Sequence, residues 1–208
     1  MITKVRVITK IGPDLKGEGI LSEIKNRLGL KNITKVSAIK VYRLEGININ
    51  QAKLLADKLL AESINQSYTI NSPIVSGQAK VVEIAYKIGV MNPEVASIMK
   101  ASSDLGIKLV AADTSFEYAF YGNLKNEDVL SLVEKLNLYN KTVEQILDKD
   151  PQTLLIKGHV GETKIIPIGK MNNKQLMEFS EDKLFLNLEE MKAIQDYFIK
   201  QERDPTNL

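Results

Sequence analysis

The 208-residue chain has no cysteine, and it has a single histidine, His159. Without cysteine there can be neither a disulfide framework nor a thiolate metal site, and this absence suits a protein of the reducing cytosol. His159 has no second imidazole with which to hold a transition metal, and no nucleophile elbow accompanies it. The sequence therefore offers no transition-metal site and no Ser-His-Asp triad, and we expect His159 to be a solvated loop residue.

Neither sign of charge dominates, and no long apolar run occurs. The 28 Lys and Arg are interspersed with 26 Asp and Glu, for a net charge of +2, so no basic face is built for a nucleic-acid backbone. No stretch approaches the roughly 20 apolar residues of a membrane span, and the first residues hold no apolar run of signal-peptide length. We expect a cytoplasmic, globular protein without nucleic-acid or membrane partners.

The chain contains an internal repeat. The segment Val5–Gly12 matches Val82–Gly89, 77 positions later, and both are β-rich runs that end in glycine. The same shift continues through one face of a following helix, where Leu21, Ile24 and Leu28 correspond to Ile98, Ala101 and Leu105. At a shift of 76 the next strands and helices match as well: Tyr42–Gly46 with Tyr118–Gly122, and residues 49–61 with 125–137.

Both first helices carry signals at their ends. Asn92 and Pro93 fit a cap and a first helical position, while Gly29 and Gly106 stand where a left-handed residue ends each helix. We therefore predict an α+β fold of two tandem duplicated βαββα units at residues 1–76 and 77–150. Their antiparallel sheets would pack as a pseudo-dimer, because an open sheet edge needs cover.

Residues 151–208 are predicted to form a helical linker with a strong start signal. The Asn187 side chain can cap a helix, the Glu190 side chain can accept from the Asn187 backbone N–H in return, and Leu186 can pack on Met191. The apolar stripe of this helix needs cover and consists of Leu188, Met191, Ile194 and Phe198. Because Asp204-Pro205 again has the pattern of a helix start, we expect the chain to be part of a longer protein.

Three other groups of residues have simpler interpretations than a binding or catalytic site. Residues 158–164 lack the lysine–hydroxyl pair of a phosphate loop and are predicted to form a hairpin turn. Glu144, Asp148 and Asp150 lack the spacing of a calcium loop and are predicted to be a solvated helix end. The aromatic residues of the second strands lack the motif of an RNA-binding sheet and are predicted to pack in a core or between repeats: Tyr42, Phe116, Tyr118, Phe120 and Tyr121.

Together these segments resemble a known family. The first unit is similar to the small PurS-type subunit of formylglycinamidine ribonucleotide synthetase, through Val5-Arg6-Val7, Lys10–Asp14, Leu28–Leu30 and Tyr42–Gly46. The segments Leu188–Phe198 and Arg203–Thr206 resemble the linker that leads into the first ATP-binding domain of the large, single-chain, PurL-type form of that enzyme.

The resemblance implies a role in purine synthesis. The complete enzyme, phosphoribosylformylglycinamidine synthase, uses ATP, magnesium and glutamine-derived ammonia to convert formylglycinamide ribonucleotide to its amidine. This chain would hold the synthetase and glutaminase parts together and line the ammonia path, with no catalytic, cofactor-binding or metal-binding residue of its own. The linker would dock onto the ATP domain through Leu188, Met191, Ile194, Phe198, Arg203 and Asp204. Cover by a second copy of the chain, through dimerisation, is the alternative.

A different function class stays open. Tandem α/β units of this size also serve as regulatory modules that bind an amino acid or another small effector. Such a module places glycine and an acid after the first strand, as in Gly12-Pro13-Asp14, but Gly89-Val90-Met91 lacks the acid and the linker would be unexplained. A free-standing scaffold or adaptor is a third possibility.

Overall fold

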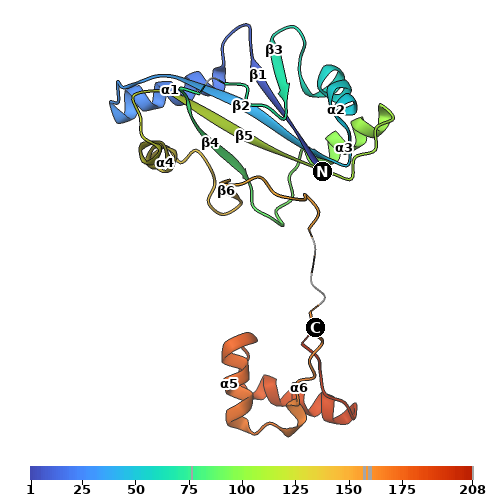
Figure 1. The fold of residues 1–208 in the computed structure, drawn as a ribbon. Helices are drawn as coiled ribbons and strands as arrows, with labels where there is room; N and C mark the ends of the chain where they lie inside the picture. The colour runs from blue at the N-terminus through green and yellow to red at the C-terminus, as the bar shows by residue number, and fades with distance from the viewer. Residues whose placement is uncertain (76, 157, 159–160, 208) are drawn as a thin grey trace. The chain divides into compact units, whose positions relative to one another are not determined.

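A computed structural model of the chain describes residues 1–75, 77–156, 158 and 161–207. The chain divides into two units, Met1–Ile156 and Lys157–Leu208, which we call the sheet unit and the helical unit. All named strands lie in the sheet unit (Figure 1).

The sheet unit holds one antiparallel sheet of six strands in the order β3-β1-β2-β5-β4-β6. The strands are β1 (Ile2–Thr9), β2 (Ile33–Glu45), β3 (Gln66–Ile70), β4 (Lys80–Tyr86), β5 (Ala111–Gly122) and β6 (Glu144–Ile146). The long strands β2 and β5 pair directly and join the two halves of the unit edge to edge. The predicted α+β class is confirmed, but the chain forms one continuous sheet and not two sheets packed together.

Each half follows the order strand, helix, strand, helix, strand. The predicted order βαββα was wrong, because the second strand runs unbroken for 13 residues in β2 and 12 in β5. A short edge strand then follows the second helix, and β3 and β6 pair with β1 and β4. These outer strands satisfy backbone groups that β1 and β4 would otherwise expose.

Capping residues set the ends of helix α1 (Leu15–Leu28). The Asp14 carboxylate accepts a hydrogen bond from the Gly17 N–H at 2.9 Å. Gly29, with a φ of 67°, ends the helix in the left-handed conformation, as predicted. The other helices of the sheet unit are α2 (Ile49–Leu55), which continues as the π-helical turn η1 (Ala56–Leu60), α3 (Val95–Asp104) and α4 (Asn126–Lys135).

Helix α3 begins at Val95, two residues beyond the predicted start at Pro93. The Asn92 side-chain oxygen accepts from the Glu94 N–H at 3.1 Å, and its amide donates to the Thr114 hydroxyl at 3.0 Å. Asn92 therefore closes a local turn through its oxygen, ahead of α3, and ties this turn to β5 through its amide nitrogen.

Two apolar cores lie on one face of the sheet, which we call the helix face. Helices α1 and α4 pack over β2, β4 and β5 around Ile24, Phe120 and Val133. Helices α2 and α3 pack over β1 and β2 around Val5 and Leu55. Figure 1 shows the two helix pairs at opposite ends of the sheet. Each core therefore combines one helix from each half of the unit.

The aromatic residues of the second strands take part in the cores, as predicted. Tyr118 and Phe120 are buried, and Tyr42, Phe116 and Tyr121 are partly buried against core residues. Their rings are thus used for packing and do not form the stacking platform that an RNA-binding sheet presents.

The opposite face of the sheet is covered by loops, and we call it the loop face. Ile39 and Val41 are fully buried there although no helix of the described chain lies over them. Ile74, Val75 and Ala79, from the connection between β3 and β4, pack against them. Residues 148–156 lie over another part of this face, through contacts given below.

The helical unit has a small core of its own. It contains η2 (Ile168–Lys170), α5 (Asn173–Lys183) and α6 (Leu188–Lys200). The predicted start of α6 is confirmed: Asn187 accepts from the Glu190 N–H at 3.0 Å, and Glu190 accepts from the Asn187 N–H at 2.8 Å. Met191 is fully buried with Ile168 and Leu176. Of the apolar stripe, Met191 thus has cover within the helical unit, while Leu188, Ile194 and Phe198 are only partly buried.

The predicted helix start at Asp204-Pro205 is wrong within the described residues. Thr206 forms an antiparallel bridge with Ile165, and the Asp204 carboxylate accepts from the Gly169 N–H at 3.1 Å. The carboxylate that could have capped a helix instead holds a turn elsewhere in the unit.

Candidate functional site

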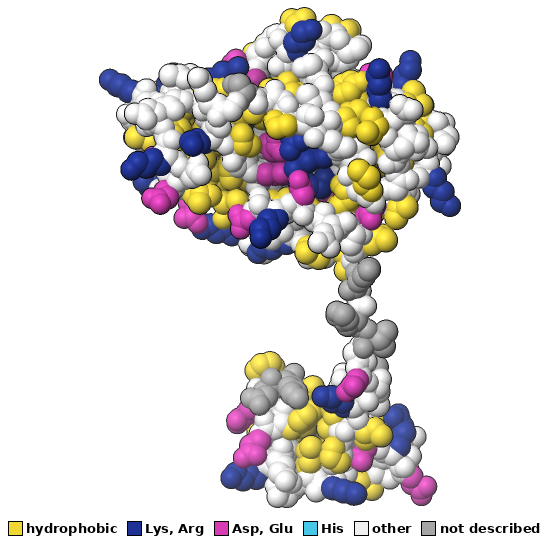
Figure 2. All heavy atoms as spheres, in the orientation of Figure 1, with side chains coloured by type: hydrophobic (Ala, Val, Ile, Leu, Met, Phe, Trp, Pro, Cys, Tyr) yellow, Lys and Arg dark blue, Asp and Glu magenta, His cyan; other side chains and the backbone are white. Residues whose placement is uncertain are grey.

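Charged side chains gather on the loop face. Because side chains alternate along a strand, β1 points Lys4 and Arg6 to this face while Val5 points to the helix face. Strands β2, β4 and β5 add Arg43, Glu83 and Glu117, and Asp150 follows β6. The resulting ionic cluster consists of Lys4, Arg6, Arg43, Glu83, Glu117 and Asp150. Figure 2 shows cationic and acidic side chains side by side near the middle of this surface.

The inner part of the ionic cluster is closely hydrogen bonded. The Arg6 Nε donates to both carboxylate oxygens of Glu117, at 2.9 and 2.8 Å. The Arg43 side chain is only 1% exposed, and its guanidinium donates to Glu83 and, at 2.8 Å, to the Ser115 hydroxyl. The Ser115 hydroxyl in turn donates to Glu83. Such partners are what a buried charge requires, since desolvation without them is strongly unfavourable.

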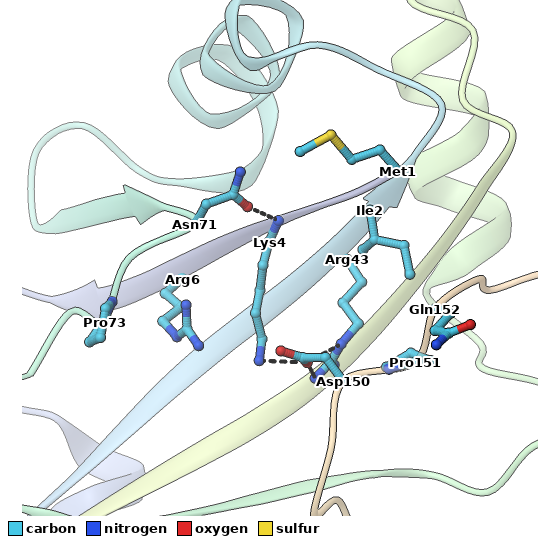
Figure 3. Close-up of a pocket in the computed structure, with 10 residues that line it drawn as sticks. All are labelled: Met1, Ile2, Lys4, Arg6, Arg43, Asn71, Pro73, Asp150, Pro151 and Gln152. Atoms are coloured by element: carbon cyan, nitrogen blue, oxygen red, sulfur yellow. Dashed lines mark hydrogen bonds and ion pairs between the residues drawn. The ribbon is translucent and has the colours of Figure 1, made fainter.

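Asp150 closes the ionic cluster on its solvent side. Its carboxylate accepts from the Lys4 ammonium and from the Arg43 guanidinium, each at 2.8 Å. The side chain of Asp150 is 58% exposed, against 11% for Lys4. Figure 3 shows Lys4 and Arg43 converging on Asp150 from neighbouring strands, beside a cavity of about 480 Å³ that Arg6 and Asn71 also line.

A second anchor fixes the same segment a few residues later. Glu45, at the end of β2, accepts from the Leu154 N–H at 2.7 Å and from the Thr153 hydroxyl at 2.9 Å. These hydrogen bonds, led by the one from Leu154, lower the pKa of the Glu45 carboxyl. Residues 148–156 are therefore tied to the loop face at two points.

The charges of the ionic cluster shift one another's ionisation. Burial alone would raise the pKa of Glu83, but the Arg43 charge and the Ser115 hydrogen bond outweigh it, so the pKa is lowered. Burial likewise opposes the hydrogen bonds from Lys4 and Arg43 at Asp150, whose pKa is also lowered. Burial would lower the pKa of Arg43, yet Glu83 and Asp150 raise it. All three groups are therefore charged at neutral pH.

The ionic cluster links parts of the fold through paired charges. Its three cations face three carboxylates, and each cation has a carboxylate partner within 3.0 Å. The contacts join β1, β2, β4 and β5 to the 148–156 segment. An external anion would compete with Asp150 for Lys4 and Arg43.

A second hollow, of about 260 Å³, lies on the helix face. It lies over β1 and β2 beside the start of α1, and Phe116, directly opposite Lys40 in the strand pairing, lines it from β5. We call it the central crevice; its walls include Thr9, Asp14, Lys16, Lys40, Gln66 and Phe116.

Two lysines of the central crevice share one aromatic ring. The Lys16 ammonium lies 3.3 Å from the centre of the Phe116 ring, and the Lys40 ammonium lies 4.5 Å from it. Lys40 also forms an ion pair with Glu94 at 2.6 Å. Burial of its ammonium end, followed by the charge of Lys40, lowers the pKa of Lys16, although Glu144, Glu94 and Asp14 act in the opposite direction.

Asp14 is the acid that the regulatory interpretation required. One of its carboxylate oxygens accepts from the Gly17 N–H at 2.9 Å, and the other accepts from the Ala38 N–H at 2.7 Å. Both oxygens are therefore engaged in holding the start of α1 against β2, which leaves Asp14 poorly placed to bind the ammonium group of an amino acid.

All six residues predicted to dock onto another domain lie in the helical unit. Leu188, Ile194 and Phe198 are partly buried against the core that contains Met191. The Arg203 guanidinium lies 5.0 Å from the centre of the Phe198 ring, which is consistent with a cation–π contact. Asp204 holds Gly169, as described above. The stripe is thus partly covered within the unit, and docking stays a prediction.

The remaining sequence candidates give no site. His159 lies outside the described residues, as does part of the hairpin predicted at residues 158–164. The prediction of a solvated helix end was wrong, because Glu144 belongs to β6 and Asp150 to the ionic cluster. In the part of the chain that the structure describes, no group of acidic or histidine side chains could hold a metal ion. No described helix combines the length and apolar character needed to cross a membrane.

Sequence reasoning missed the ionic cluster and the central crevice. One signal was available: Lys4 and Arg6 interrupt the apolar side chains of β1 at alternate positions, as Glu83 does in β4. The same alternation is typical of an antiparallel strand with one face open to solvent, so by itself it did not identify the cluster. The partners themselves are distant in sequence and could not be identified from it.

Comparison with models of known protein families and with curated proteins finds no match to this chain.

Proposed function

We propose that this chain is an assembly module: the PurS-like, N-terminal part of a phosphoribosylformylglycinamidine synthase of the PurL type. In this role it holds the synthetase and glutaminase parts of the cytoplasmic enzyme together and lines the path of ammonia between them. ATP and magnesium would be bound by the synthetase part, and the chain itself would carry no catalytic residue.

The strand register of the sheet unit is the observation that carries this proposal. Thr3 pairs with Leu44 in the first half, and their repeat counterparts Lys80 and Phe120, which follow 77 and 76 positions later, pair with each other. At the junction, Lys40 pairs with Phe116, its own counterpart 76 positions later. This register supports a tandem duplication in which the two copies associate as a twofold pseudo-dimer.

A rigid wall suits the passage of ammonia. Ammonia in transit must be kept from water and from protonation, which calls for a dry and well-ordered boundary more than for reactive side chains. Each core contains a helix from each half of the sheet unit. On the other face, the ionic cluster joins four strands. These features favour a stiff scaffold.

The test separates assembly from chemistry. The chain, with the synthetase and glutaminase parts supplied in the same reaction, is assayed for amidine formation with glutamine and, separately, with free ammonia. Phe198→Ala should lower the glutamine-dependent rate several-fold while leaving the ammonia-dependent rate within twofold, because docking and not chemistry is impaired. Phe185→Ala is the matched control, since Phe185 is an 86% exposed phenylalanine of the same unit.

The same variant also tests the burial of the stripe. Since Phe198 is only partly buried, its loss should cost well under the roughly 3–5 kcal/mol of a fully buried phenylalanine. Equal glutamine-dependent rates for Phe198→Ala and the parent chain, or no association of the chain with the other parts, would remove the support for docking.

The regulatory module stays the second candidate because of the central crevice. The crevice is concave and lined by lysines at the junction of the two halves. An effector bound there would contact both halves at once, which is how a ligand could bias their packing. Dimerisation of the chain is compatible with either role.

A further inference from the structure

The central crevice lies between the two cores, since Ala38 of one core and Val7 of the other both line it. Core residues of α1 and α4 surround Ala38 on one side, and those of α2 and α3 surround Tyr42 on the other. Lys40 stands between these two positions on β2, and Phe116 lies opposite it on β5. Charged side chains at such a junction interrupt apolar packing, so their presence needs a reason.

The two lysines of the crevice differ in their partners. Lys40 is only 17% exposed and has Glu94 as its partner. The Lys16 ammonium lies over the Phe116 and Tyr118 rings, at 3.3 and 5.6 Å from their centres, and forms no ion pair among the described residues.

Three carboxylates are close enough to act on the charge of Lys16, and each has another partner. The oxygens of Asp14 accept two backbone N–H groups. Glu94 is paired with Lys40, and a carboxylate oxygen of Glu144 accepts from the Asn140 N–H at 2.7 Å. Lys16 is therefore the cation of the crevice that these acids leave without a direct contact.

The surroundings of Lys16 disfavour its charged state. Burial of the ammonium end and the nearby Lys40 charge together lower the pKa of Lys16. An anion placed between the two ammonium groups would replace repulsion by attraction, and in a partly desolvated hollow this attraction is stronger than in water.

We propose that the central crevice is a binding site for an oxyanion, a carboxylate or phosphate group carried by a small molecule, held between the ammonium groups of Lys16 and Lys40. Thr9 and Gln66 on the rim supply further polar atoms, and the Phe116 ring forms the apolar floor. At about 260 Å³ the hollow suits an ion or a small metabolite and is smaller than a usual drug-sized pocket.

This site does not depend on the assembly role. The ionic cluster on the other face is a weaker candidate, because an anion there would compete with Asp150 for cations that already have partners. In the crevice Lys40 has a carboxylate partner, Glu94, but Lys16 forms no ion pair among the described residues.

The test is a titration of the full chain at constant ionic strength, with inorganic phosphate in one arm and acetate in the other. Binding is followed by nuclear magnetic resonance, using the lysine signals of the labelled protein and the aromatic signals of Phe116. Saturable shifts confined to Lys16, Lys40 and Phe116 are expected in at least one arm. The arm that saturates identifies phosphate or carboxylate as the bound group. On saturation the pKa of Lys16 should rise, since an anion stabilises its charged form.

Lys16→Met should weaken binding at least tenfold without affecting the fold, because Lys16 is exposed as a whole residue and forms no ion pair among the described residues. Lys35→Met is the matched control: Lys35 is also exposed, and its ammonium lies 5.5 Å from the Tyr121 ring outside the crevice. The affinity of the Lys35→Met variant for the anion should stay within twofold of that of the parent chain. Equal affinity in Lys16→Met, or no saturable binding of either anion, would overturn the proposal.

Discussion

The two halves of the sheet unit have the same strand pairing and opposite charges on the loop face. The cations of the ionic cluster, Lys4, Arg6 and Arg43, all come from the first half, whereas Glu83 and Glu117 come from the second. In the predicted repeat register Arg6 corresponds to Glu83, so the corresponding positions carry opposite charges. The halves are alike in backbone and complementary in side chains.

This difference indicates how the correct pairing is specified. Two copies of the first half, paired through β2 alone, would place Arg6 where Glu83 now lies and Val41 where Glu117 lies. The cations would then lack carboxylate partners on the loop face, which is strongly unfavourable for buried groups. Complementary charges thus favour pairing of the two different halves over pairing of two identical copies, because identical copies would leave their cations without carboxylate partners.

Exchanging charges between the halves should have the largest effect on stability. Arg6→Glu places a carboxylate beside Glu117, whose side chain is 8% exposed, and should lower the free energy of unfolding by at least the roughly 3–5 kcal/mol of a broken buried pair. The double variant Arg6→Glu/Glu117→Arg should recover a good part of that loss. Urea unfolding followed by circular dichroism measures both. A double variant no more stable than Arg6→Glu would contradict complementarity.

Removing one carboxylate of the second half should have a smaller effect. Glu83→Gln leaves Arg43 and Lys4 with fewer carboxylates, but Asp150 still contacts both. We expect a loss toward the lower end of about 3–5 kcal/mol. The control is Glu134→Gln, since Glu134 forms a solvent-exposed pair with Lys141 that should be worth at most about 1 kcal/mol. Similar losses in the two variants would show that burial of the cluster is unimportant.

Asp150→Asn should cost still less, because this carboxylate is mostly exposed. We expect a change of about 1 kcal/mol or less in global stability. The same variant should increase hydrogen exchange in residues 148–156, since one of their two anchors is lost while that at Glu45 stays. Unchanged exchange at Thr153 and Leu154 would show that the Glu45 anchor alone orders the segment.

The acid sensitivity of the unit should show the smallest difference. The pKa values of Glu83 and Asp150 are lowered below their ordinary 4.5 and 3.8. Their contribution to stability is therefore present above those ordinary values and is lost as the pH falls through the lowered values. The free energy of unfolding should decline below about pH 4.5 in the parent chain. The decline should be shallower in Glu83→Gln/Asp150→Asn, and an equal decline would assign acid sensitivity to other carboxyls.

The sequence by itself determined features that depend on neighbouring residues. The start of α6 follows from Asn187 and Glu190, three positions apart, and the end of α1 follows from Gly29. The apolar periodicity located the helices of both halves, and the α+β class followed from the order of periodic segments. In each case the stabilising contacts lie within one or two turns of chain, so the local sequence contains both partners.

Only the tertiary structure decided which residues meet from a distance. Lys4 contacts Asp150 across 146 positions, and Lys16 reaches a ring on β5 that the sequence places 100 residues away. A distant contact also overrode one local signal: the Asp204 carboxylate accepts from the Gly169 N–H and does not start a helix. The physical reason is that a polar side chain takes the best partner the folded chain brings within reach, and strand pairing fixes which partners those are.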